Sequence, residues 1–159
     1  MTGLGGYAGH SHKYKKKGGS GYLFRTSTVQ DFSGVTGACL LVKTAVYDEM
    51  HGLDEQFAVA FNDVDFCLRV RDAGYRIAWT PYAELIHYES KSRGGDEKDP
   101  VKAARFAAEQ QRLYTIHGKE NILDDPYYNP NLTRDREDFS EGNDLRGLKE
   151  GRITVQWRG

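Results

Sequence analysis

Two carboxylates and a histidine are the residues of this chain whose types and spacing suggest chemistry. Asp63 and Asp65 lie at the start of a segment with helical spacing, and His87 ends a short strand-like run further along the chain. Carboxylates take part in proton transfer, and imidazole suits divalent ions such as Mn²⁺. Because a helix and a following strand can bring these positions together, we expect Asp63 and His87 at the rim of one cleft.

A helix and two short strands must position these residues. Apolar residues recur at helical spacing over residues 62–73, and Gly74 follows in the position of a left-handed helix end. The pattern then predicts a strand over residues 75–80, ended by Pro81, and a second short strand over residues 83–88. The predicted order is therefore helix, strand, strand.

Further elements are predicted on both sides of this stretch. The β-rich residues 35–43 predict a buried strand, and residues 44–50 a short helix after it. The alanine-rich residues 100–117 predict the longest helix. Turn-forming residues dominate positions 119–159, apart from a final strand predicted at 152–157.

The start of the helix over residues 62–73 admits a structural explanation beside the chemical one. Asn62 can act as the N-cap, with Asp65 reaching back to it as in a capping box. Asp63 would then interact only with the helix dipole. This arrangement explains Asn62 and Asp65 well, so Asp63 is the sharper candidate for chemistry.

Composition limits the class of protein. The 159 residues fit one domain, while 18 glycines and 28% charged residues indicate long solvated loops. A net charge of −1 argues against a general electrostatic grip on nucleic acid. No apolar run approaches the roughly 20 residues that span a bilayer, and no signal peptide opens the chain. We expect a cytoplasmic protein without a transmembrane segment, for which peripheral contact with the inner face of the membrane stays open.

The two cysteines give a prediction of their own. Cys39 and Cys67 both lie inside apolar segments, and the chain has no other cysteine. We expect two buried free thiols in a reducing compartment, rather than a disulfide or a zinc site.

Three regions differ in composition. Residues 1–34 form a Gly/Lys-rich loop region, residues 35–118 the core, and residues 119–159 a turn-rich tail. Because a domain seldom begins with so long an irregular stretch, we expect partner strands of the core outside this chain. Sheet edges exposed in this way would favour self-association, which allows a homo-oligomer.

Several ordered motifs with compatible gaps carry a family resemblance. They are residues 36–42 (TGACLLV), 52–55 (GLDE), 61–69 (FNDVDFCLR), 73–76 (AGYR), 79–87 (WTPYAELIH), 90–94 (SKSRG) and 125–132 (DPYYNPNL). Together they resemble the second half of a bacterial family 2 glycosyltransferase of the GT-A fold. The resemblance is to the rhamnosyltransferase-like members and to enzymes of O-antigen or cell-wall glycan synthesis.

The resemblance implies a fold and a division of labour. It implies the C-terminal half of an α/β GT-A fold, with a mixed sheet flanked by helices. In that family the first half binds the nucleotide and ends in an Asp-x-Asp motif, which holds a divalent metal and the donor diphosphate. The sequence before Val35 does not match that half, and residues 63–65 belong to the later acceptor-side motif. We therefore expect an acceptor-side part of a larger polypeptide, which would be inactive in isolation.

The resemblance also implies roles for single residues. Asp63 matches the general base that deprotonates the acceptor hydroxyl, so that it can attack the sugar of a nucleotide-diphosphate donor with inversion. His87 matches a ligand that completes a Mn²⁺ or Mg²⁺ site, although one ligand alone will not hold a metal. A structural histidine is the alternative for His87.

Other matching residues would contact the acceptor or the leaving group. Arg93 would steady the nucleoside diphosphate as it leaves, with a flexible polar loop as the alternative. The residues assigned to the acceptor site are Asp54, Glu55, Thr36, Gly37, Asn62 and Trp79. A solvated turn for Asp54 and Glu55, and core packing for Trp79, are the structural alternatives.

Three functions stay open from the sequence. The first is a glycosyltransferase of polysaccharide synthesis, with a nucleotide-diphospho-sugar donor and a glycan acceptor as partners. The second is a non-catalytic carbohydrate-binding or scaffold module, which would bind glycan without nucleotide or metal. The third is a small hydrolase that pairs Asp63 with Asp54 or Glu55, whose carboxylates would lie roughly 5–9 Å apart.

Overall fold

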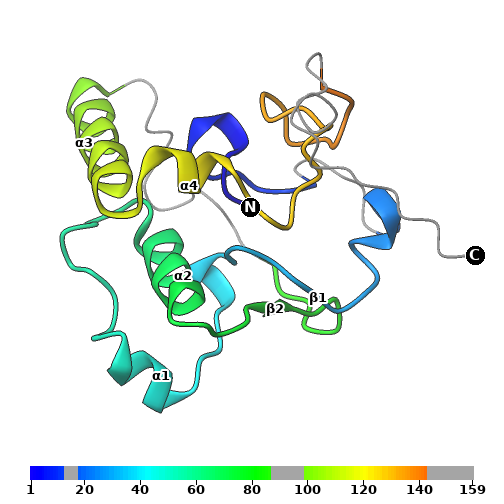
Figure 1. The fold of residues 1–159 in the computed structure, drawn as a ribbon, viewed down its shortest axis with the longest axis horizontal. Helices are drawn as coiled ribbons and strands as arrows, with labels where there is room; N and C mark the ends of the chain where they lie inside the picture. Colours follow the sequence, from blue (N-terminus) through cyan, green and yellow to red (C-terminus); the bar gives the residue numbers. More distant parts are fainter. Residues whose placement is uncertain (13–17, 87–98, 143–159) are drawn as a thin grey trace, which may run out of the picture.

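The computed structural model describes residues 1–12, 18–86 and 99–142. Figure 1 shows the α-helices gathered on one side of the molecule and loops with a small sheet on the other. The elements are the 3₁₀ helices η1 (Leu4–Gly6), η2 (Tyr22–Phe24) and η3 (Gly37–Cys39), the α-helices α1 (Thr44–Glu49), α2 (Asn62–Asp72), α3 (Pro100–His117) and α4 (Lys119–Leu123), and the strands β1 (Gln30–Asp31) and β2 (Ala78–Trp79).

Helix α2 is the centre of the packing. One side of it buries Leu68 against Leu113 of α3 and Ile122 of α4. The other side buries Phe66 and Val70 in a second cluster. Partly buried residues of the segment 35–42 and of α1 cover this cluster. Because α2 is buried on two sides, its position is fixed by most of the helical part of the molecule (Figure 1).

The predictions of helices agree closely with the structure. Helices α1, α2 and α3 begin at the predicted residues and end within one residue of them. Asp99 precedes α3 and accepts a hydrogen bond from the Val101 N–H at 2.9 Å, which caps the helix. The sequence did not predict α4, because Gly118 ends α3 with φ of 77° and the chain re-enters a helix of only five residues.

The predicted strand over residues 35–43 is wrong. Thr36 accepts a hydrogen bond from the Ala38 N–H and starts η3, and the rest of the segment is extended without pairing. An isolated strand leaves its backbone N–H and C=O groups without partners. The described residues offer this segment no neighbouring strand, and Leu41 is 98% exposed.

The sheet is much smaller than the mixed sheet predicted from the sequence. Within the described ranges it consists of β1 and β2, which pair antiparallel with Gln30 opposite Trp79 and Asp31 opposite Ala78. Only two residues of the strand predicted at 75–80 belong to it. Residues 83–86 contain no strand, and positions 87–88 and 152–157 of the other predicted strands lie outside the described residues.

The N-terminal residues pack against the segment that follows α4. Leu4 is buried with Tyr128 and Phe139 in a third cluster. The buried carboxylate of Asp125 accepts hydrogen bonds from the Thr2 N–H and the Ser33 hydroxyl, and so holds both ends of the first region. None of the helices in the described ranges combines the length and the apolar character that crossing a membrane requires.

Candidate functional site

The site is built at the first turn of α2. Phe61, the residue before the helix, has a left-handed backbone with φ of 66°, a conformation that costs a bulky residue roughly 1–3 kcal/mol. Its buried ring packs edge-on against Tyr7 and tilted against Phe106, and these contacts hold the turn in place. Such strained residues often lie beside functional groups, and Asp63 follows two positions later.

The side chain of Asp63 is fixed by backbone donors on two segments. Its Oδ1 accepts from the Val64 N–H at 2.8 Å, and its Oδ2 accepts from the Gly37 N–H at 2.7 Å. Gly37 approaches so closely that a Cβ on it would lie 3.2 Å from the Asp63 Cβ. The structure therefore brings Thr36–Gly37 of η3 and Asn62–Asp63 of α2 together, although they are far apart in the sequence.

This arrangement leaves Asp63 able to act on a ligand. A carboxylate has about four lone-pair positions, and the two backbone donors occupy two of them. Asp63 is partly exposed at the surface, so a hydroxyl of a bound molecule can reach the remaining positions. A carboxylate held in this way can accept a proton at a defined place.

The predicted capping box is wrong. Asn62 is the first residue of α2 and not its N-cap, and its Oδ1 accepts from the neighbouring Asp63 N–H at 2.8 Å. Asp65 does not reach back to Asn62. Its carboxylate turns into the protein, where it is 1% exposed and binds other partners.

Asp65 joins three parts of the molecule. Its Oδ1 lies 2.8 Å from His117 Nε2 at the end of α3, and its Oδ2 accepts from Arg69 Nε at 2.9 Å. Arg69 also donates to the backbone carbonyls of Met50 and Gly52, in the turn after α1. This buried network fixes the first turn of α2, and with it Asp63, relative to α1 and α3.

The network also decides the protonation of Asp65. Burial acts to raise its pKa, but hydrogen bonds from His117 and Arg69 outweigh burial, so that the pKa lies below its usual range. Asp65 therefore carries its charge in the folded protein at neutral pH, as a structural anion.

Asp54 lies in the turn that the same network supports. It accepts from Arg112 of α3 at 2.6 Å and from the Gln56 N–H at 2.9 Å. These hydrogen bonds, the one from Arg112 first, lower the pKa of Asp54 below its usual value. Glu55 beside it is exposed.

The other predicted site residues are not joined to Asp63 by any contact that we observe. Trp79 of β2 is partly buried and lies edge-on to Phe32, with ring centroids 6.1 Å apart. His87 and Arg93 lie outside the described residues, so the predicted cleft between Asp63 and His87 stays a prediction.

The cysteines differ from each other. Cys67 is buried on α2 as predicted, and burial raises the pKa of its thiol. Cys39 is exposed, which corrects its predicted burial. The reason is that Cys39 lies in the exposed 3₁₀ helix η3 instead of a buried strand.

The sequence did not single out the residues that support the site. His117 carries a weak signal, because a basic residue in the last turn of a helix interacts well with the helix dipole. Nothing in the sequence connects it with Asp65, from which it is separated by 52 positions. Arg69 and Arg112 look like ordinary surface cations on helices.

The described residues do not form the divalent-metal site that the family resemblance implies. Among them, no group of three or more histidine, cysteine, aspartate or glutamate side chains is arranged to hold an ion. Both oxygens of Asp63 already accept backbone hydrogen bonds. We therefore assign no described residue to a metal.

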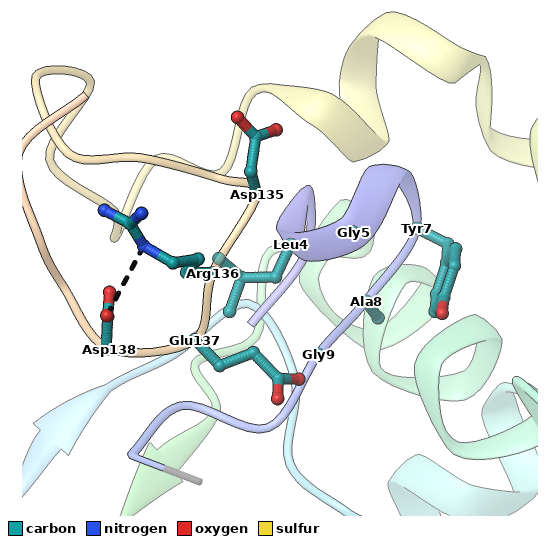
Figure 2. Close-up of a pocket in the computed structure, with 9 residues that line it drawn as sticks. All are labelled: Leu4, Gly5, Tyr7, Ala8, Gly9, Asp135, Arg136, Glu137 and Asp138. Atoms are coloured by element: carbon teal, nitrogen blue, oxygen red, sulfur yellow. Dashed lines mark ion pairs between the residues drawn. The ribbon is translucent and has the colours of Figure 1, made fainter. Parts of the chain in front are cut away.

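A hollow of about 490 Å³ lies elsewhere, between the N-terminal segment and residues 135–138. Figure 2 shows the two walls, with charged side chains on one of them. None of the predicted site residues in the described ranges lines it. It is connected with the first turn of α2 through Tyr7, whose ring packs on Phe61.

Comparison with known proteins finds partial similarity to proteins of bacterial glycan synthesis. The chain is 47% identical over 140 residues to an uncharacterized protein of Sinorhizobium fredii, covering 87% of this chain and 15% of that protein. It is 32% identical over 134 residues to the O-antigen biosynthesis protein RfbC of Myxococcus xanthus, covering 84% and 10%. It is 32% identical over 80 residues to the N-acetylglucosaminyl-diphospho-decaprenol L-rhamnosyltransferase of Mycobacterium tuberculosis, covering 50% and 24%.

These similarities show distant, partial homology to bacterial glycosyltransferases and O-antigen biosynthesis proteins. The chain spans only about a tenth to a quarter of the length of these relatives. No protein-family model and no solved structure matches it. The chain is thus related to glycosyltransferases of cell-surface polysaccharide synthesis over a small part of their length.

Proposed function

We propose that this chain is the acceptor-side part of an inverting glycosyltransferase of the GT-A fold, with Asp63 as the general base. The observation that carries the proposal is the fixed carboxylate of Asp63, held between the first turn of α2 and the Gly37 N–H with lone pairs to spare. The partial homology with a rhamnosyltransferase supports the same reaction class.

The proposed reaction needs one proton acceptor from this chain. Asp63 takes the proton of a glycan hydroxyl while that oxygen forms a bond to the anomeric carbon of the donor sugar. The bond from that carbon to the nucleoside diphosphate breaks, and the diphosphate leaves with the bonding electron pair. Attack from the face opposite the leaving group inverts the anomeric centre.

The partners follow from this reaction. The donor is a nucleotide-diphospho-sugar, bound mainly by a part of the enzyme outside this chain, where the divalent metal would also be held. The acceptor is a hydroxyl of a growing glycan, met by Asp63 and by the turn of Asp54 and Glu55. We place the reaction in the cytoplasm, at the inner face of the membrane, and keep the roles of His87 and Arg93 as predictions.

Replacement of Asp63 tests the assignment. In the full-length enzyme, Asp63→Asn should lower kcat by about 10²–10⁴-fold, because it removes the proton acceptor. Donor affinity should change little, since Asp63 does not contact the donor in this scheme. Both quantities are measured by product formation and by donor titration, and an unchanged kcat would refute Asp63 as the base.

Two further variants make the test sharper. Gly37→Ala should lower kcat by roughly tenfold, because its Cβ forces a shift of Asp63. Ala38→Gly is the matched control on the same exposed turn and should leave kcat unchanged. If glycan binds to the chain equally well with and without nucleotide sugar, and no product forms, the binding-module hypothesis replaces the transferase.

A further inference from the structure

The hollow between the two walls has the size of a small-ligand site. Its volume of about 490 Å³ lies within the range of roughly 300–1,000 Å³ that ligand pockets cover. One wall is the segment of residues 4–9, which contributes Leu4, Tyr7 and Ala8. The other wall is the run of four charged residues 135–138 (Figure 2).

The two walls are held together before any ligand arrives. The Gly5 N–H donates to the Arg134 carbonyl at 2.8 Å, and the His10 N–H donates to Glu137 Oε1 at 2.8 Å. Gly9 lies so close to the second wall that a Cβ on it would meet Glu137 Oε1 at 2.5 Å. The hollow is therefore largely preformed, which lowers the cost of binding.

The charged wall offers both acceptors and a donor. Arg136 donates to the Ser140 hydroxyl at 2.7 Å and lies 3.5 Å from the Asp138 carboxylate. Asp135 is exposed, and in the described part of the chain its carboxylate forms no hydrogen bond or ion pair. The wall thus presents carboxylate oxygens and a guanidinium side by side.

This combination selects against several kinds of ligand. Among the described lining residues, a nucleotide or free phosphate would meet three carboxylates and one guanidinium, which disfavours an anion. A purely apolar ligand would cover the Asp135 carboxylate without giving it a hydrogen-bond partner. No group of metal-binding side chains is arranged here within the described residues.

A neutral saccharide fits what remains. Its hydroxyls donate to carboxylates and accept from a guanidinium, and such charge-assisted hydrogen bonds are the stronger ones. The C–H face of a sugar ring can lie on Ala8, which is partly exposed in the hollow. The carboxylates therefore accept hydrogen bonds from neutral hydroxyl groups, which add no charge to the hollow.

We propose that this hollow binds a saccharide unit of the glycan, as a subsite separate from Asp63. The proposed function supplies the source of the ligand, a glycan acceptor, but the binding itself does not require Asp63. The packing of Tyr7 on Phe61 joins one wall of the hollow to the turn that precedes α2. A glycan held in the hollow would thus be bound to the same rigid support as the proposed base.

Titration of the chain with a rhamnose–N-acetylglucosamine disaccharide, followed by calorimetry, tests the proposal. We expect saturable binding that Asp135→Ala and Arg136→Ala each weaken by about tenfold, the loss of one charge-assisted hydrogen bond. Asp72→Ala, on the exposed end of α2, should leave the affinity unchanged. Urea unfolding of every variant shows that the fold is kept.

Three results would overturn the proposal. They are the absence of binding at millimolar disaccharide, wild-type affinity in both hollow variants, and tight binding of spermine that competes with the disaccharide. The last result would show a cation site instead. Failure of the proposed function is distinguishable, because an unchanged kcat of the Asp63→Asn enzyme leaves disaccharide binding in the hollow intact.

Discussion

The first turn of α2 and the charged wall of the hollow (residues 135–138) both contain aspartates, and these aspartates differ in their surroundings. At α2, Asp65 is 1% exposed. It is held by Arg69, one turn further along α2, and by His117 at the end of α3. In the charged wall, Asp135 is exposed, and the contacts of Asp138 are with Ser140 and Arg136, two residues away. The first carboxylate is part of the fold, and the second group is available to a ligand.

The difference teaches how to separate structural from functional carboxylates. A buried charge costs several kcal/mol unless every partner is in place, so its replacement disturbs all the elements it joins. An exposed charge with local partners adds about 1 kcal/mol or less to stability. Asp63 lies between the two extremes, since it is partly exposed but is fixed by backbone donors from two segments.

The largest effect on stability should come from Asp65→Ala. It leaves Arg69 and His117 without their carboxylate in the interior, and breaking a buried pair in this way costs about 3–5 kcal/mol. The free energy of unfolding in urea measures the loss. Asp72→Ala, on the same helix but exposed and 3.7 Å from Arg71, is the control and should change stability by less than about 0.5 kcal/mol. Equal losses of stability in the two variants would contradict the distinction between the buried and the exposed carboxylate.

A smaller effect on stability should come from the hollow, through Gly9→Ala. The added Cβ would meet Glu137 Oε1 at 2.5 Å and the Leu4 Cβ at 2.8 Å, so the Glu137 side chain and the backbone of the segment of residues 4–9 must shift. Overpacking of this kind costs about 1–3 kcal/mol, and disaccharide affinity should fall with it. Gly142→Ala meets its neighbours only at 3.2 Å or more and should cost less. A larger loss in Gly142→Ala than in Gly9→Ala would contradict the close approach of the walls.

Helices were predictable from the sequence because their signals are local. The apolar spacing of α2, the proline and Asp99 at the start of α3, and the glycines after both helices lie within the elements themselves. The strand over residues 35–43 was wrong for the opposite reason. A strand needs a neighbour, and the sequence of residues 35–43 does not say whether the neighbour is present.

The candidate site was predictable in the residues that meet at Asp63, but not in the residues that support them. Asp63 and Gly37 were singled out, and the structure places them in contact. Asp65 and His117 form the support, yet their pairing depends on the packing of α2 against α3. The hollow was not predicted, because its walls are a glycine-rich segment and a charged run that read separately as loops.

The smallest effect should come from Arg112→Gln, which removes the side-chain partner of Asp54. The pair is partly exposed, so the loss should be about 1 kcal/mol or less and should shrink further in high salt. Arg112→Lys keeps the charge and is the matched control.

The pH dependence identifies the cause of that loss. Since Arg112 lowers the pKa of Asp54 in the fold, the stability from the pair is present above the usual aspartate pKa of about 3.9 and is lost as pH falls through the lower folded value. The wild-type and Arg112→Gln unfolding energies should therefore differ at neutral pH and converge at strongly acidic pH. A difference that persists in acid would assign the effect of Arg112 to its packing over the Phe57 ring, 5.4 Å away, instead of to Asp54. The ion pair with Asp54 would then contribute nothing to the turn, and the hydrogen bond from the buried network to that turn would be the one from Arg69 to the Gly52 carbonyl.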